Sequence, residues 1–154
     1  MLIKLFDFET NRIYLAAPTG KAAARLVDAI QTAKRNLPYN NSIIAAMPAE
    51  AFTIHRMLQP IPGSTSFQLN AERLLPADVV IVDEASMVDL PLMSKLIQAL
   101  PLNTKVILIG DKDQLASVEA GAILGDICAC GKVQVFSKTY SRLFFSFDRT
   151  SNSF

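Results

Sequence analysis

Two adjacent carboxylates follow a short apolar run in the middle of the chain. Asp83 and Glu84 come directly after Val79–Val82, which reads V-V-I-V. At the end of a buried strand such a pair is typical of a Walker B site, in which the first carboxylate holds Mg²⁺ and the second orients and deprotonates an attacking water. Asp83 is therefore a candidate metal-binding and catalytic residue, and Glu84 a candidate general base. An acidic pair that only caps the next turn fits the pattern equally well.

A second polar loop follows another apolar run. Residues 105–109, K-V-I-L-I, are followed by Gly110, Asp111 and, three positions further on, Gln114. The Gln114 amide could sense the γ-phosphate of a nucleotide or its attacking water, and a loop that does so can change shape on hydrolysis. Gly110, Asp111 and Gln114 are thus candidate nucleotide-binding residues, and Gln114 is also a candidate catalytic residue. Two such loops in this order are more specific than either one alone.

A third stretch, L-A-A-P-T-G-K-A-A-A-R-L, contains the Gly20-Lys21 pair that could end a phosphate-binding P-loop, G-x-x-x-x-G-K-[ST]. Alignment on that pair puts Leu15 at the first glycine and Ala22 at the hydroxyl position. Leu15 cannot make the tight turn around the phosphates, and Ala22 has no oxygen for Mg²⁺. A degenerate P-loop and a plain turn with a solvated lysine both stay open as alternatives.

A site for a nucleic-acid backbone phosphate fits this stretch better. A turn that leads into a helix N-terminus binds anions through its free backbone amides. Thr19 supplies a hydroxyl, Gly20 an accessible amide and Lys21 a positive charge, while Arg25 lies one helical turn further on the same face. We expect these residues to contact a nucleic-acid backbone.

The alternation of strands with helices predicts an α/β fold with a mainly parallel sheet, in which the loops at the carboxyl ends of the strands meet along one edge. The continuous apolar runs are typical of parallel strands that are buried on both faces. The expected strands are residues 12–17, 79–82 and 105–109. The expected helices are residues 21–35, a short helix capped by Thr53 and ending at Leu58, a helix capped by Asp89 and ending near Leu100, and residues 120–129.

The composition limits the classes of protein to consider. The chain has 154 residues, of which 51% are hydrophobic, and a net charge of +1. This length suits one domain, and the near-neutral charge means that any attraction to nucleic acid is local. Cys128 and Cys130, with the single His55, are too few for a zinc site, and the absence of a disulfide framework fits the cytoplasm. No apolar run approaches the ~20 residues of a membrane span, so no membrane contact is expected.

Four motifs in order resemble the RecD family of superfamily 1 DNA helicases, the alpha chains of exodeoxyribonuclease V. They are A-A-P-T-G-K-A-A-A-R-L, T-I-H-R-M-L, V-I-V-D-E-A-S-M-V-D-L-P and I-G-D-K-D-Q-L-A-S-V-E-A-G-A-I-L-G-D-I-C. The resemblance covers roughly residues 12–129. It implies ATP-driven 5′-to-3′ movement along single-stranded DNA, with Mg²⁺, within a three-subunit nuclease-helicase that repairs double-strand breaks.

The resemblance also assigns roles to residues. The first motif, with Pro18, Thr19, Gly20, Lys21 and Arg25, would contact single-stranded DNA. The second would add Thr53, His55 and Arg56, for which a capped surface helix with a partly buried His55 is the alternative. The Asp83-Glu84 pair would be motif II, and the segment from Gly110 to Gln114 would be motif III.

The sequence also departs from the family. It contains no G-x-x-x-x-G-K-[ST], and nothing after about residue 130 resembles a second motor domain. We therefore expect a partial RecA-like domain at residues 1–131 and an irregular or atypical tail at residues 132–154. In the family's sheet order, 5-1-4-3-2, the expected strands would be numbers 2, 3 and 4, with an open edge where the P-loop strand belongs. The isolated chain should lack ATPase activity, and a non-enzymatic remnant that only binds DNA or a partner subunit is the alternative.

Overall fold

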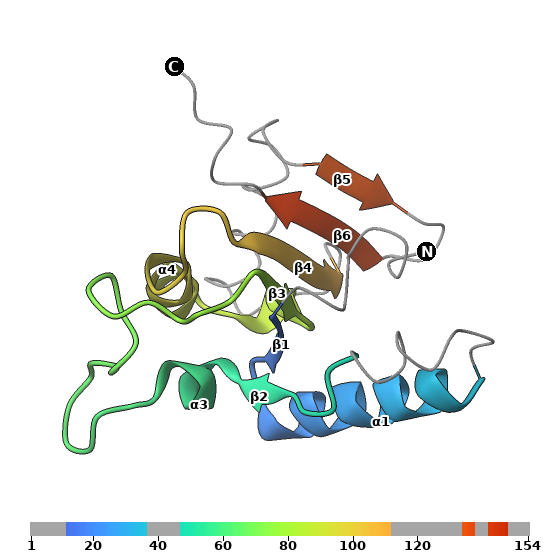
Figure 1. Cartoon of the computed structure of the whole chain (residues 1–154), viewed down its shortest axis with the longest axis horizontal. Helices are drawn as coiled ribbons and strands as arrows, with labels where there is room; N and C mark the ends of the chain where they lie inside the picture. Colours follow the sequence, from blue (N-terminus) through green and yellow to red (C-terminus); the bar gives the residue numbers. More distant parts are fainter. Residues whose placement is uncertain (1–11, 37–46, 112–133, 138–141, 148–154) are drawn as a thin grey trace.

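The computed structural model describes residues 12–36, 47–111, 134–137 and 142–147. They form one six-stranded sheet in the order β2-β1-β3-β4-β6-β5 (Figure 1). The strands β1 (Ile13–Ala17), β2 (Phe52–Thr53), β3 (Val79–Val82) and β4 (Lys105–Asp111) are parallel. The parallel strands β1, β3 and β4 were predicted, whereas the two-residue strand β2 was not. β1, β3 and β4 are contiguous, in the order that the family resemblance implies.

Helices cover both faces of the sheet, as side chains that alternate along each strand require. α3 (Ile54–Leu58) and α4 (Leu90–Gln98) pack on one face, and α1 (Gly20–Asn36) lies along β1 on the other. Two consecutive alanines of β1 lie on opposite faces of the sheet. Ala16 belongs to the core with α3 and α4, whereas Ala17 packs with Ala22 and Ala23 of α1. The larger core is built from Ile54, Leu58, Val80, Val82, Leu92, Leu96, Leu100, Val106 and Leu108.

The helices begin where their capping residues predict. The Thr53 hydroxyl accepts a hydrogen bond from the Arg56 amide at 3.1 Å, and Asp89 Oδ1 accepts one from the Leu92 amide at 2.7 Å. α4 ends at Gln98 rather than near Leu100. The Ala99 carbonyl accepts a hydrogen bond from the Leu75 amide at 2.8 Å, so the last residues before Pro101 turn toward the loop that precedes β3.

The cap of α3 yields a stability prediction. Thr53→Ala removes the only acceptor that the described residues provide for the Arg56 amide, and the loss of an N-cap hydroxyl costs about 1 kcal/mol. Urea unfolding should show this loss for the alanine variant, and Thr53→Ser, which keeps the hydroxyl, should retain most of the stability. Equal stabilities for the two variants would contradict this account of the cap.

The C-terminal segment differs from the sequence prediction. β5 (Gln134–Ser137) and β6 (Arg142–Phe147) are antiparallel to each other, and β6 pairs antiparallel with β4 from Val106↔Phe147 to Asp111↔Arg142. The edge of β4 that we expected to be open is therefore covered, and the segment is not wholly irregular. The expected helix at residues 120–129 lies outside the described residues, as do Cys128 and Cys130. None of the helices in the described ranges is long and apolar enough to cross a membrane.

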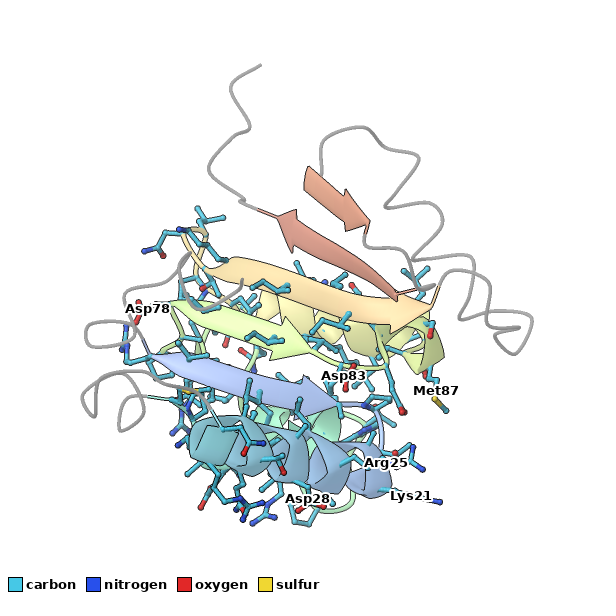
Figure 2. All side chains as sticks on the ribbon, turned by 90° about the vertical axis from the view of Figure 1, so that its right-hand side faces the viewer. Lys21, Arg25, Asp28, Asp78, Asp83 and Met87 are labelled. Carbon is cyan, nitrogen blue, oxygen red and sulfur yellow. The ribbon has the colours of Figure 1, made fainter. Side chains whose placement is uncertain are left out.

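An ion pair joins β1 and β3 at the amino ends of the strands. Asp78 accepts hydrogen bonds from the Arg12 amide at 2.7 Å, from Nε at 3.0 Å and from Nη2 at 3.2 Å. The hydrogen bonds from the Arg12 side chain and amide lower the pKa of the Asp78 carboxyl below its ordinary value, and the same contact raises the pKa of Arg12. Figure 2 shows Asp78 at the opposite end of the sheet from Asp83.

This pair gives the fold an acid dependence. The folded-state pKa of Asp78 is depressed, so its contribution to stability is present above the unfolded-state pKa, about 3.9, and is lost as the pH falls through the lower folded value. Asp78→Asn should therefore cost stability at pH 7 and little once the pH is below that folded value. Urea unfolding of the wild type and the variant, at pH 7 and at a pH below the folded-state pKa of Asp78, measures the two losses. A stability loss that is the same at both pH values would contradict this role of Asp78.

Candidate functional site at the carboxyl edge of the sheet

The predicted functional segments meet at one edge of the sheet. The registers align Ala16 with Val82 and Val82 with Leu108, so β1 and β3 end at nearly the same level. β4 continues three residues further, and Gly110 and Asp111 pair with β6 instead of forming the loop predicted after residue 109. Figure 2 shows Asp83, Lys21 and Arg25 together at this end. Thr53 ends β2 beside Ala17, and Gly110 and Asp111 end β4 on the other side of β3. The expected convergence at the carboxyl edge is thus present in the fold.

Asp83 and Glu84 occupy a fixed turn at the end of β3. The Asp83 amide donates to the Ala16 carbonyl at 2.9 Å, and Asp83 Oδ1 accepts from the Glu84 amide at 2.9 Å. Glu84 has φ 52° and ψ 38°, a left-handed conformation that is uncommon for a residue with a side chain and that persists only where neighbouring contacts impose it. A short 3-10 helix, η2 (Ala85–Met87), follows. Asp83 therefore caps the turn through one of its two carboxylate oxygens. This capping contact is the one expected by the alternative interpretation, in which the acidic pair only caps the next turn.

The second oxygen of Asp83 is the feature that suits a metal. Within the described residues no donor occupies Oδ2, and no three carboxylate, histidine or cysteine side chains gather into a metal site. Mg²⁺ bound to a nucleotide commonly takes one or two protein carboxylates and fills its other positions with phosphate oxygens and water. The donor set at the end of β3 fits that pattern.

The N-terminus of α1 is open to a ligand. The Thr19 hydroxyl accepts from the Ala22 amide at 3.2 Å, and the Thr19 carbonyl accepts from the Ala23 amide at 3.0 Å. Gly20 does not have a positive φ, and a methyl group added to it would meet no atom within 4 Å. The fold does not require glycine there, so the missing side chain leaves space above the helix N-terminus. Lys21 is exposed, and Pro18 is half-buried beside it.

The other predicted DNA contacts lie on and before α3. Thr53 is its N-cap, and both His55 and Arg56 are exposed, so His55 is not the partly buried residue of the alternative interpretation. The His55 ring centroid lies 5.8 Å from that of Phe67, and the Arg56 guanidinium lies 5.8 Å from the centre of the Phe52 ring. These aromatic contacts were not predictable from the sequence, because Phe67 belongs to a loop without periodicity.

One contact within the site was not predicted. Arg25 Nη1 lies 3.7 Å from Glu84 Oε1, which joins the candidate DNA-binding helix to the candidate general base. The residues are far apart in the sequence, and only the packing of α1 beside β1 brings them together. Gln114 cannot be placed in the same way, since it lies outside the described residues, and of Asp111 only the backbone is described.

The match to a family agrees with this fold. Residues 2–120 match the AAA domain family, and the chain therefore belongs to it. The RecBCD enzyme subunit RecD of Haemophilus influenzae is 44% identical over 131 residues, which are 82% of this chain and 20% of that protein. The RecBCD enzyme subunit RecD of Mycolicibacterium smegmatis is 48% identical over 118 residues, 75% of this chain and 21% of that protein. The predicted resemblance to RecD is confirmed.

A further relative is the ATP-dependent RecD2 DNA helicase of Deinococcus radiodurans, 38% identical over 70% of this chain and 12% of that protein. The chain spans about a fifth of the length of the two RecD subunits. Among solved structures, "The structure of LepI complex with SAM" aligns over 96% of this chain and 46% of that chain with a TM-score of 0.45 and 9% identity, a similarity too low to support an inference about function.

Proposed function

We propose that this chain forms part of the motor of an ATP-dependent DNA helicase. The observation that supports the proposal is that two candidate sites lie at one sheet edge, with the Asp83-Glu84 pair at the end of β3 and the open N-terminus of α1 beside it. The similarity to RecD subunits and to a RecD2 helicase supports this assignment.

In this proposal the carboxyl edge holds ATP and Mg²⁺. Asp83 would hold the metal through its second oxygen, and Gly110, Asp111 and Gln114 would report the γ-phosphate of the nucleotide. Glu84 orients the water that attacks the γ-phosphorus and accepts its proton as the bond to the ADP oxygen breaks. The 154 residues contain no G-x-x-x-x-G-K-[ST], so the chain by itself should not hydrolyse ATP at a useful rate.

The DNA contacts lie beside this nucleotide site. The open Gly20 amide and the Lys21 charge take a backbone phosphate, and the Thr19 hydroxyl can donate to the same oxygens while it accepts from Ala22. His55 and Arg56 would extend the path of single-stranded DNA along α3. The whole assembly would move 5′ to 3′ in the cytoplasm with the other subunits of exodeoxyribonuclease V.

The experiment separates the two halves of the site in the complete helicase. Lys21→Ala should weaken single-stranded DNA binding and reduce the slope of log K against log salt by about 1, because one phosphate contact is lost. Asp83→Asn should leave that slope unchanged and lower the rate of Mg²⁺-dependent hydrolysis. The proposal is overturned if Lys21→Ala binds DNA with the wild-type salt dependence, or if Asp83→Asn hydrolyses ATP at the wild-type rate.

A further inference from the structure

The contact between Arg25 and Glu84 links the two halves of the site. The Nη1–Oε1 separation of 3.7 Å is too long for a hydrogen bond, so the pair is held by charge alone. The Arg25 side chain is 66% exposed and that of Glu84 is 27% exposed. Arg25 is therefore accessible to a solvent-borne anion while its partner is largely enclosed.

The backbone of Glu84 is fixed, so only its side chain can change direction. Its amide donates to Asp83 Oδ1 at 2.9 Å, and its carbonyl accepts from the Met87 amide at 3.0 Å. The ion pair draws the carboxylate toward α1, which packs against β1. β4, with Gly110 and Asp111, pairs with the opposite side of β3. The carboxylate thus turns away from the end of β4, whose residues are proposed to report the γ-phosphate.

A DNA phosphate competes with Glu84 for the same guanidinium. Arg25 lies one turn after Lys21 on the same face of α1, and Figure 2 shows both at this end of the helix. A phosphate seated at the helix N-terminus can accept two short, charge-assisted hydrogen bonds from an arginine, which are stronger than a partly exposed ion pair without hydrogen bonds.

We propose that Arg25 is a positioning residue that makes hydrolysis depend on DNA. Without DNA it holds the Glu84 carboxylate toward α1; when single-stranded DNA binds, Arg25 turns to a backbone phosphate and releases Glu84 to act as the base. This inference rests on the proposed function and adds the means by which DNA regulates it.

The test uses the complete helicase and measures ATP hydrolysis with and without single-stranded DNA. Arg25→Met should raise the DNA-free rate about 2- to 5-fold, the population change expected when a partly exposed ion pair is lost. It should also weaken DNA binding and bring the ratio of the two rates closer to 1. Arg25→Lys should restore part of that ratio, because a lysine keeps the charge but not the bidentate geometry.

Arg35→Met is the matched control, since Arg35 lies at the far end of α1 and hydrogen-bonds to Thr32; it should leave both rates unchanged. The regulatory role is overturned if the wild type is stimulated by DNA and Arg25→Met leaves the DNA-free rate unchanged or lowers it. A wild type with no DNA stimulation would instead overturn the proposed function itself, so the two failures can be told apart.

Discussion

Replacement of Glu84 by glutamine should nearly abolish ATP hydrolysis by the complete helicase. Glutamine keeps the shape of the side chain but cannot accept a proton, and a positioned general base contributes about 10²- to 10⁴-fold to a rate. Single-stranded DNA binding should be retained or become slightly tighter, because the open face of α1 is not altered and the glutamine no longer competes with DNA for Arg25. Steady-state hydrolysis at saturating DNA and Mg²⁺, together with a DNA-binding titration, measures both effects.

A matched control for this substitution is Glu72→Gln. Glu72 is exposed in the loop before β3, and only its backbone amide bonds to the Asn70 side chain. The same change of carboxylate to amide at this position should leave hydrolysis unchanged. If Glu72→Gln and Glu84→Gln slow hydrolysis to the same extent, the loss at Glu84 cannot be assigned to a base.

Truncation of Leu96 should have the largest effect on stability. Leu96 on α4 has no exposed surface and packs in the main core against the sheet. Removing a buried leucine side chain costs about 2–5 kcal/mol, a large share of the roughly 5–15 kcal/mol that stabilises a domain. Urea unfolding of Leu96→Ala should show this loss as a lower midpoint.

The control for Leu96→Ala is the same substitution at an exposed leucine near α4. Leu102, after α4, is 67% exposed, so Leu102→Ala should change stability by no more than about 0.5 kcal/mol. The packing described here for α4 would be contradicted if Leu96→Ala unfolded at the same urea concentration as the Leu102 variant.

Local signals in the sequence predicted most of the parallel part of the fold. The continuous apolar run Val79–Val82 and the capping residues Thr53 and Asp89 act through their immediate neighbours, and each has the predicted place in the structure. The antiparallel pairing of β6 with β4 was missed because it depends on a distant edge with free backbone groups, and local periodicity does not report such a partner. The end of α4 at Gln98 also involves a distant partner, since the carbonyl of the next residue, Ala99, accepts a hydrogen bond from the Leu75 amide.

The candidate site was predictable in its position and not in its contacts. Parallel strands bring their carboxyl ends to one edge, so Thr19, Asp83 and Gly110 could be expected together. The direction of the Glu84 side chain could not, because it depends on how α1 packs beside β1 and where Arg25 then falls. The roles assigned to these residues remain predictions, and Gln114 lies outside the described residues.

The most direct test of the central claim is the rate of ATP hydrolysis by the complete helicase, measured with and without single-stranded DNA. The claim is that one sheet edge joins a DNA-binding helix N-terminus to a hydrolytic carboxylate pair. It predicts a rate that rises with DNA and a rise that disappears in Glu84→Gln. A rate that is the same with and without DNA, or a DNA-stimulated rate that survives in Glu84→Gln, would contradict it.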